Sequence, residues 1–399
     1  MSTTTKSVPV MTASGARRLP IGALTALALI GFVLIAMETM PAGLLPEIAN
    51  GMGTSESAVG LFVSAYALGT VIVTVPAISL TRGFRRKPLL LIGVAGLALA
   101  NAITAVSPDV AVSLISRFVA GSFSGVIWGM LANYAIRISP PARSGLALSI
   151  MSTGAPVGFA FGTPLGTYIG GLTDWRWTFA GMSLLALVIG LLILACVPDA
   201  SGLPATGRLP LRRVLGLRGV PIVLIVIIVW MLAHSTIYTF IAPYLRVTET
   251  GITPDLLLLI YGVASLGGVA LVGVFLDRYP RALLHISAAV FSVAGVVLLV
   301  GHASASAIIV AAVLWGISFG GTAPQLQNAL SRAGGDNADI ANSFLPVAFN
   351  LAIFGAGILG GVVLIGAGAL MLPAVMAVLG LAALALTIFG RRSAFLAPR

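Results

Sequence analysis

The sequence predicts an all-α integral membrane protein with twelve transmembrane helices in two pseudo-symmetric six-helix bundles. Three observations lead to this fold class. The 399-residue chain is 58% hydrophobic and only 8% charged, with a mean hydropathy of +1.09, whereas soluble domains carry roughly 25% charged residues. Apolar runs long enough to cross a hydrocarbon core of about 30 Å recur along the whole chain. The second half of the chain also repeats features of the first half at a constant spacing.

Each predicted span is an apolar run of about 20 residues. The first run is too long for the apolar core of a secretory signal and lacks a small-residue cleavage site, so we expect it to be retained. A Pro-, Gly- and Arg-rich stretch separates two sets of six runs and is expected to be a cytoplasmic linker. The predicted domains are therefore residues 1–197, the linker 198–219 and residues 220–399. The spans are Leu19–Leu45, Val59–Leu80, Pro88–Val106, Val110–Ile136, Leu146–Ile169, Trp177–Val197, Val220–Leu245, Leu256–Leu276, Leu283–Val300, Ser306–Leu330, Ile340–Ile365 and Ala369–Phe389.

The basic residues predict the orientation, because cytoplasmic loops of membrane proteins are enriched in Lys and Arg. With a cytoplasmic N-terminus, nineteen of the 22 basic residues lie on the inner side, Arg176 and Arg246 lie outside, and Arg117 lies within span four. We therefore expect a multi-pass protein of a bacterial cytoplasmic (inner) membrane with both termini in the cytoplasm. The net charge of +11 then reflects orientation and does not indicate a nucleic-acid partner. The inner residues are Lys6, Arg17, Arg18, Arg82, Arg85, Arg86, Lys87, Arg137, Arg143, Arg208, Arg212, Arg213, Arg218, Arg278, Arg281, Arg332, Arg391, Arg392 and Arg399.

The two halves resemble each other at an offset of 195 residues. A single constant offset at three places predicts a duplicated six-helix unit, as in many transporters. The matching positions are Phe84 and Tyr279, Arg86 and Arg281, Gly121 and Gly316, Gly125 and Gly320, Gly162 and Gly357, and Gly166 and Gly361.

Glu38 is the carboxylate set inside a predicted span. An ionisable group at hydrocarbon depth costs at least about 2.5–3.5 kcal/mol, so it normally faces a bundle interior and has a partner. At 1.5 Å per residue, Glu38 lies about 10 Å from the outer end of span one, and Arg117 lies about 10 Å from the outer start of span four. We expect these two charges to be partners, with Tyr66 near the same level. Two roles stay open for the pair: a fixed structural ion pair, or an acid that carries a proton.

Polar residues in other spans predict a central cavity. At the duplication offset His234 falls on Thr39, next to Glu38, so both halves present polar groups at equivalent places in their first helices. His234 is either a hydrogen-bonded interior residue or a titrating one, and Asn350 either lines the cavity or makes interhelical hydrogen bonds. The residues expected to line the cavity are Tyr66, His234, Tyr238, Thr239 and Asn350.

The sequence lacks the residues that an ATP-driven pump or a metalloenzyme would need. The lysines, Lys6 and Lys87, follow no Gly-rich phosphate-binding loop, which argues against an ATP-driven pump. His234 and His302 have no metal-ligand spacing, and the single cysteine, Cys196, can form no intramolecular disulfide. We therefore expect no cofactor, no metal and no enzyme.

Glycines number 47 and gather in a few spans. The series Gly154, Gly158 and Gly162 has the four-residue spacing that lets helix backbones approach closely in lipid. Such a face either packs tightly or also slides during conformational change. The esterase-like pattern at 316–320 lies in an apolar helix without the strand-turn-helix context of a nucleophile, and we interpret it as a packing face.

Several motifs occur together along most of the chain. They are Glu38-Thr39 with Gly43–Ala49, Ser64–Gly69, the basic loop Arg82–Lys87, Arg117 with Gly121 and Gly125, Gly162–Thr167, Trp175-Arg176 with Phe179, His234–Pro243 and the loop Gly273–Arg281. Jointly they resemble the major facilitator superfamily. Within it they resemble the twelve-span drug:proton antiporter group, which includes bacterial exporters of chloramphenicol-like drugs, sugars and nucleosides.

This resemblance implies further roles. It associates Arg117 with proton coupling and the glycine-proline motif of span five with antiport. In the loop after span two Arg82 stands where the family has an aspartate, whereas the loop after span eight keeps Asp277. We expect Asp277 to hold a charge contact near the gate, so Asp277→Asn should alter transport more than Arg82→Ala. The expected antiporter and gating residues are Gly154, Gly158, Gly162, Pro164, Gly166, Arg86, Asp277, Arg278 and Arg281.

The sequence therefore predicts a proton-coupled secondary active transporter that exports drug-like, sugar or nucleoside compounds by alternating access. A proton-linked importer or a passive facilitator of the same fold stays open as the alternative. One acid and one arginine leave the cavity near neutral, without a spare counter-ion for a dication, which favours neutral or weakly charged substrates. The expected partners are a small-molecule substrate, protons and the lipid bilayer, with the protein acting as a monomer.

Overall fold

The computed structural model describes residues 19–81, 83–202, 215–217, 219–392 and 394–395. These residues form helices and connecting turns, and none of them lies in a strand. Twelve helical segments among them are long and apolar enough to cross a membrane. The predicted all-α fold with twelve spans is confirmed. Arg82 and most of the predicted linker lie outside the described residues.

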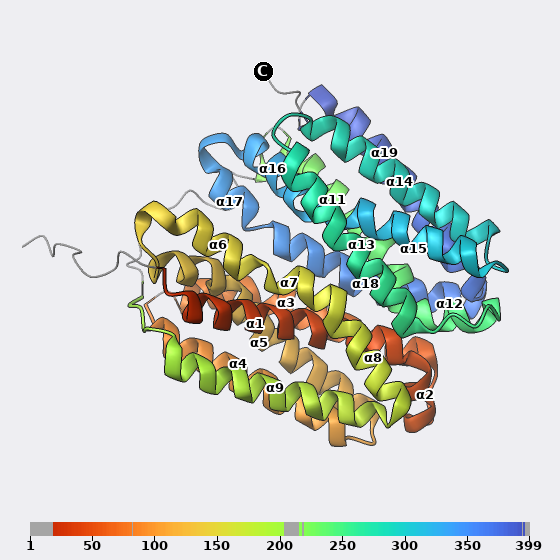
Figure 1. Cartoon of the computed structure of the whole chain (residues 1–399), viewed down its shortest axis with the longest axis horizontal. Coiled ribbons are helices and arrows are strands. Elements are labelled where there is room, and N and C mark those ends of the chain that lie inside the picture. Colours follow the sequence, from red (N-terminus) through yellow and green to blue (C-terminus); the bar gives the residue numbers. More distant parts are fainter. Residues whose placement is uncertain (1–18, 82, 203–214, 218, 393, 396–399) are drawn as a thin grey trace, which may run out of the picture.

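The first six spans contain the helices that Figure 1 draws from red to light green. They are α1 (Ile21–Thr39), η1 (Met40–Leu44), α2 (Leu45–Met52), α3 (Glu56–Leu80), α4 (Arg86–Val106), α5 (Val110–Arg137), η2 (Pro141–Arg143), α6 (Ser144–Ser152), α7 (Gly154–Val157), η3 (Gly158–Gly162), α8 (Thr163–Leu172) and α9 (Trp175–Cys196).

The second six spans follow from green to blue and form the other group of helices in Figure 1. They are α11 (Val220–Thr239), α12 (Ile241–Thr248), α13 (Pro254–Phe275), α14 (Pro280–Val300), α15 (Ala305–Gly320), α16 (Thr322–Gly334), η4 (Gly335–Asn337), α17 (Ala338–Asn342), α18 (Leu345–Gly366), η5 (Ala369–Met371), α19 (Leu372–Phe389) and η6 (Gly390–Arg392).

Span one is broken in its outer half, where the sequence predicted one continuous helix. The α-helix α1 ends at Thr39, a 3₁₀ turn follows, and α2 continues the span to Met52. Pro41 lies in the turn and has no N–H to donate to the carbonyl four residues earlier. That carbonyl belongs to Met37, directly before Glu38. The break therefore leaves a main-chain acceptor in the bundle interior beside the buried acid.

The two groups of helices contact each other at the end that carries α2, α8 and α12 (Figure 1). The Ser64 hydroxyl of α3 donates to the Phe354 carbonyl of α18 at 2.8 Å. Glu56, at the start of α3, forms an ion pair with Arg246 of α12. In the predicted orientation this closed end faces outward.

Candidate functional site

Arg117 of α5 is fully buried and points at the break in span one. Its Nη2 donates to the Met37 carbonyl at 2.7 Å and approaches the Glu38 carbonyl at 3.4 Å. Its Nη1 donates to the Asn101 side-chain oxygen at 3.4 Å. The guanidinium thus supplies a donor to the acceptor that Pro41 leaves unpaired. Arg117 connects spans one, three and four around this point.

Glu38 lies beside this arginine without pairing to it through its side chain. The residue is only 5% exposed, and its Oε1 has no hydrogen-bond partner among the residues that the structure describes. Within that same part of the chain, no ion pair within 4.0 Å joins the Glu38 carboxylate to Arg117. The two residues are neighbours, as the depth count predicted, but Arg117 contacts Glu38 at its main-chain carbonyl.

Tyr66 of α3 completes the surroundings of Arg117. The guanidinium carbon lies 4.6 Å from the centre of the Tyr66 ring, a cation–π distance. The Tyr66 hydroxyl donates to the Leu34 carbonyl of α1 at 3.4 Å. Tyr66 therefore lies at the level of the two charges, as expected. Its ring packs against the Arg117 guanidinium.

Hydroxyl groups next to the acid lie at the boundary with the second half of the chain. The hydroxyls of Thr39 in α1 and Thr163 in α8 form a hydrogen bond of 2.6 Å. The hydroxyl of Tyr238 in α11 lies beside this pair, yet it has no hydrogen-bond partner of ordinary geometry in the described chain. One residue thus separates Glu38 from a contact between the two halves.

His234 lies at the centre of an aromatic cluster. The indole Nε1–H of Trp315 donates to His234 Nδ1 at 3.0 Å, so the proton of the neutral ring is on Nε2. Phe319 stacks on the same ring with centroids 3.6 Å apart and planes 9° apart. The other rings within about 6.5 Å of His234 are Phe159, Tyr238 and Tyr261.

Phe159 brings the first half of the chain into this cluster. It lies in η3, a π-helical turn of span five, and its ring meets that of Tyr238 edge-on at 5.9 Å. A π turn inside an α-helix frequently marks a functional site. Close contact of the halves here requires a glycine at Gly262, where a Cβ would overlap the Ala160 backbone.

The remaining expected cavity residues are placed differently. Thr239 is buried at the end of α11. The Asn350 amide donates to the Pro346 carbonyl in its own helix at 3.0 Å, and its Oδ1 has no partner among the described residues. The structure therefore groups Tyr238 with His234, whereas the hydrogen bond of the Asn350 side chain lies within α18.

The glycine series of span five packs on α1 in constant register. A Cβ at Gly154 would meet the backbone of Ala28, at Gly158 the carbonyl of Phe32 and at Gly162 the Cβ of Ala36. Each glycine thus faces the α1 residue 126 positions earlier. Pro164 opens α8, and a Cβ at Gly166 would meet Met40, which continues the register. This glycine face lets the backbone of span five pack directly against α1, the helix that carries Glu38.

The expected charge contact of the gating loop is absent from this structure. Asp277 is exposed, and no described basic residue lies within 4.0 Å of it. Arg278 lies over the ring of Tyr279 at 5.2 Å, and Arg281 lines a small pocket. The loop between spans eight and nine is short and turned into solvent, so its acid and its arginines do not converge.

An equivalent contact is present in the first half, through an acid that we had not singled out. The Asp199 carboxylate forms an ion pair with Arg85 at 2.6 Å and accepts a hydrogen bond from the Lys87 N–H at 3.0 Å. The Ala200 carbonyl accepts from the Arg86 N–H at 2.8 Å. Desolvation raises the pKa of Asp199, but the N–H donors and Arg85 outweigh it and hold this pKa below its ordinary value. Asp199 thus ties the start of the linker to the loop after span two.

Sequence reasoning missed several residues of the site. They are Thr163, Phe159, Tyr261, Trp315, Phe319 and Asn101. A signal existed for two of them, because Trp315 and Phe319 are four residues apart on one helix face, like His234 and Tyr238 on another. In the described part of the chain no three His, Cys, Asp or Glu residues gather into a group that could hold a metal ion.

Two bundles of six spans, with a buried acid and arginine at a helix break and an aromatic cluster between the bundles, define a membrane transport protein. A family profile described as Major Facilitator Superfamily matches residues 27–356. The chain therefore belongs to the major facilitator superfamily, and the resemblance inferred from its motifs is confirmed. It is a multi-pass membrane transporter of small molecules.

Curated relatives extend over almost the whole chain. A chloramphenicol efflux pump of Mycobacterium tuberculosis (strain CDC 1551 / Oshkosh) is 29% identical over 378 residues, which cover 92% of this chain and 91% of the relative. A probable sugar efflux transporter of Helicobacter pylori (strain P12) is 27% identical over 365 residues, covering 88% of this chain and 91% of the relative.

Solved structures share the fold. A D-xylose-proton symporter has a TM-score of 0.72 at 16% identity, covering 92% of this chain and 96% of that one. The xylose transporter XylE of E. coli, in a partially occluded inward-open conformation, has a TM-score of 0.71 at 14% identity, covering 95% and 99%. At these identities the likeness shows the fold alone.

Proposed function

We propose that this protein is a proton-coupled exporter of small molecules that works by alternating access, and that it performs no enzymatic chemistry. The observation that carries the proposal is the buried Glu38 carboxylate. It lies inside a span, next to a buried arginine, with one oxygen that has no partner in the described chain. A carboxylate in such a place is neutralised by a cation or by a proton. The relatives named as efflux pumps support export as the direction.

The arrangement around Arg117 supports a proton in preference to a fixed ion pair. Arg117 directs Nη2 at the carbonyls of the helix break, and its contacts with Tyr66 and Asn101 hold it there. A structural ion pair would bring the carboxylate within 4.0 Å of the guanidinium, and it does not do so here. We infer that the present geometry corresponds to a protonated Glu38. Release of the proton would then draw the carboxylate toward Arg117.

Coupling to substrate follows from the hydroxyl contact between α1 and α8, which lies next to Tyr238 of the second half. Thr39 is bonded to Thr163 and lies beside Tyr238, so a movement of Glu38 acts directly on the junction of α1, α8 and α11. The contacts at the end predicted to face outward, Ser64 with Phe354 and Glu56 with Arg246, support an inward-open state. In that state the cavity exchanges with the cytoplasm, where an exporter takes up its substrate.

We further propose two rigid units, residues 1–197 and 220–399, joined by the linker 198–219. Both termini would be cytoplasmic, in the inner membrane of a bacterium, and the protein would act as a monomer without a nucleic-acid partner. Reporter fusions after Gly53 and Thr250 should then report the outside. Fusions after Gly207 and at Arg399 should report the inside. A cytoplasmic signal after Thr250 would contradict this topology.

The proposed function is tested by transport into inside-out membrane vesicles. A panel of amphenicols, sugars and nucleosides is offered with a pH gradient, without one, and with an uncoupler. An exporter coupled to protons accumulates its substrate only when the vesicle interior is acidic. Equal entry with and without the gradient would identify a passive facilitator. Loss of preloaded substrate on acidification of the interior would identify a proton-linked importer.

A further inference from the structure

Phe240 lies at a break in span seven. Helix α11 ends at Thr239 and α12 begins at Ile241, and Phe240 between them has φ −105° and ψ 27°, outside the helical region. At the offset of 195 residues it matches Leu45, which begins α2 after the break in span one. Both bundles therefore break their first span at equivalent points, and the Phe240 side chain is fully buried at its break.

The Phe240 ring fits between two glycines that belong to different bundles. A Cβ at Gly60 of α3 or at Gly360 of α18 would overlap atoms of this ring. A larger side chain at either position would therefore displace the ring. Helix α18 belongs to the same bundle as Phe240, whereas α3 belongs to the other one. Separation of the bundles would withdraw the ring from Gly60 and leave its contact with Gly360 intact.

The ring stands between the candidate site and the end that carries α12. Along α3, Gly60 lies between two contacts that join the bundles, the ion pair of Glu56 and the hydrogen bond of Ser64. On the other side, Tyr238 of the aromatic cluster lies two residues before Phe240. A molecule that leaves the cluster toward this end along α3 meets the layer formed by Gly60 and Phe240.

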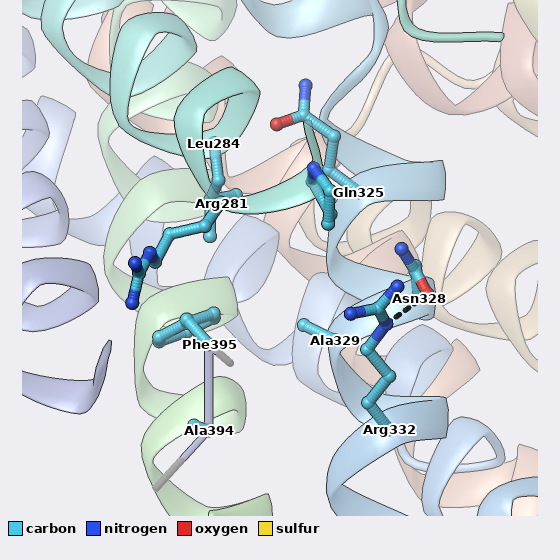
Figure 2. A pocket seen from close by; sticks show the side chains of 9 residues that line it. Arg281, Leu284, Gln325, Asn328, Ala329, Arg332, Ala394 and Phe395 are labelled. Carbon is cyan, nitrogen blue, oxygen red and sulfur yellow. Dashed lines mark hydrogen bonds between the residues drawn. The ribbon is translucent and has the colours of Figure 1, made fainter. Parts of the chain in front are cut away.

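The opposite end of the second bundle is filled less completely. Helix α14 runs between the two ends. Its Leu298 carbonyl accepts from the Tyr244 hydroxyl of α12 at 2.7 Å, whereas its first residue, Pro280, lines a small pocket with Gln325 and Arg332 (Figure 2). Polar side chains thus border open space at that end. The tight apolar seat of an aromatic ring lies at the end where α12 meets the first bundle.

We propose that the Phe240 ring is an apolar plug that closes the substrate path at the end predicted to face outward. This inference rests on the alternating access of the proposed function. In the closed state the ring fills the space beside Gly60 and excludes water and substrate. Opening moves α12 and α18 away from α3 and takes the ring with them. Position 60 must therefore be glycine for this end to close, but not for it to open.

The test measures how fast a cysteine beneath the ring reacts with a membrane-impermeant maleimide added outside intact cells. The reporter is Ser64→Cys in a Cys196→Ser background, because Ser64 is only 2% exposed and lies one helical turn further into α3 than Gly60. Phe240→Ala removes the ring and should raise the labelling rate at least about tenfold, which corresponds to about 1.4 kcal/mol in the opening equilibrium. Gly60→Ala keeps the ring but fills its seat, and should raise the rate as well.

The effects of the two changes should not add. In the double variant Gly60→Ala with Phe240→Ala, the new methyl group has no ring to displace, so labelling should be no faster than with Phe240→Ala alone. Gly267→Ala is the matched control, because no atom lies within 4 Å of a Cβ at that position, and it should label like the reporter alone. Opening relieves the clash at Gly60, so Gly60→Ala tests the plug even if Phe240→Ala folds poorly.

Two outcomes would overturn the plug. An equal rise in labelling from Gly60→Ala with and without the Phe240 ring would show that the methyl group acts on the packing of α3 and α18. Unchanged labelling in both single variants would show that other contacts close this end. Labelling requires neither substrate nor a proton gradient, so a failure of the proposed coupling in the vesicle assay leaves its pattern intact and is told apart from a failure of the plug.

Discussion

Arg117 contacts Glu38 through the backbone of that residue, with Nη2 at 3.4 Å from the Glu38 carbonyl, while the two described side chains form no ion pair within 4.0 Å. The cause lies three residues further along. Pro41 cannot donate to the Met37 carbonyl, and Arg117 does so instead at 2.7 Å. The arginine is therefore held by the helix break, which leaves the Glu38 carboxyl without an ion pair to Arg117, as the proposed proton exchange requires.

We predict that Glu38→Gln abolishes gradient-driven transport and leaves the protein folded. The amide keeps the shape of the protonated acid but cannot release a proton, so the cycle stops in one state. Uphill export is measured in inside-out vesicles, and folding is checked by the melting temperature of the purified protein. Glu47→Gln, in the same span at the outer helix α2, is the matched control and should transport normally. Undiminished uphill export by Glu38→Gln would rule out the coupling role.

Arg117 also stabilises the fold, so substituting it should lower stability, whereas Glu38→Gln should not. Arg117→Ala removes donors from the Met37 carbonyl and from Asn101 and leaves both acceptors buried. Hydrogen bonds to a charged group contribute about 1.5–3 kcal/mol, so we expect a loss of roughly 2–4 kcal/mol in the free energy of unfolding. Thermal unfolding in detergent measures this loss. If Arg117→Ala melted at the temperature of Glu38→Gln, the helix break would not depend on the arginine.

The contact between α3 and α18 offers a direct test of alternating access. A Cβ at Gly361 would lie 3.5 Å from the Ser57 Cβ, within the range for a disulfide. The double substitution Ser57→Cys and Gly361→Cys, in a Cys196→Ser background, should cross-link under mild oxidation and stop transport. Reduction should restore it. The control pair Gly53→Cys with Gly361→Cys should transport under both conditions. Full transport by the cross-linked protein would exclude opening at this end.

Asp199 and Asp277 should contribute differently to stability. The pKa of Asp199 is lowered by its N–H donors and by Arg85, against the effect of desolvation. An acid whose folded pKa is depressed stabilises the protein above its unfolded pKa of about 3.9 and loses that effect as the pH falls through the folded pKa. Asp199→Asn should therefore lower the melting temperature at pH 7 by about 1–2 °C.

The difference between Asp199→Asn and the unaltered protein should shrink below about pH 4. Asp277→Asn should leave the melting temperature unchanged, because Asp277 is exposed and has no ion pair in the described chain. Its expected effect on transport rate, relative to Arg82→Ala, is a separate prediction that concerns another conformational state. A larger loss of stability for Asp277→Asn than for Asp199→Asn would contradict the assignment of the contact.

The spans could be predicted because their cause is local. An apolar run of sufficient length forms a membrane helix whatever its neighbours, so each of the twelve predicted segments overlaps one of the twelve observed in the described chain. The break in span one was not predicted, although Pro41 and Gly43 stand in the sequence. Proline in a membrane helix is often accommodated by neighbouring helices, and here Arg117 donates to the carbonyl of Met37, eighty residues earlier. Only the packing of α5 on α1 shows which donor replaces the missing N–H.

The site was predicted only in part, because the sequence gives the depth of a residue along its span but not its contacts with other helices. Depth along each span placed Glu38 and Arg117 at one level, because the rise per residue of a helix is constant. Depth says nothing of rotation about the helix axis, which decides whether a side chain meets its neighbour. Rotation brings Trp315 and Phe319 onto His234 and leaves Asn350 bonded within its own helix. The acid of the loop contact lies after span six, outside the motif that suggested Asp277.

The last prediction concerns the kind of substrate, and the charges and rings of the site together decide it. Among the residues that the structure describes, the buried charges are one acid, Glu38, and one arginine, Arg117, and that arginine donates to main-chain carbonyls. A dication would therefore meet a single carboxylate, which in the proposed mechanism also carries the proton.

The wall toward the second bundle is aromatic, and the neutral His234 presents its ring to Phe319 and its Nδ1 to Trp315. Such a wall binds flat rings by stacking and offers the Tyr238 hydroxyl, which lacks a partner in the described chain, to a polar substituent. We expect neutral or weakly charged, moderately polar molecules, with aromatic amphenicol-like compounds and nucleosides ahead of sugars.

This expectation is checked by overexpressing the protein in a drug-sensitive host and measuring tolerance to an amphenicol and to a dicationic dye. Amphenicol tolerance should rise several-fold and dye tolerance should stay unchanged. Trp315→Phe keeps the ring but removes the donor to His234, so it should reduce amphenicol export more than Trp177→Phe, an exposed tryptophan and the matched control. Protection against the dication alone would show that neither the charge count nor the aromatic wall selects the substrate.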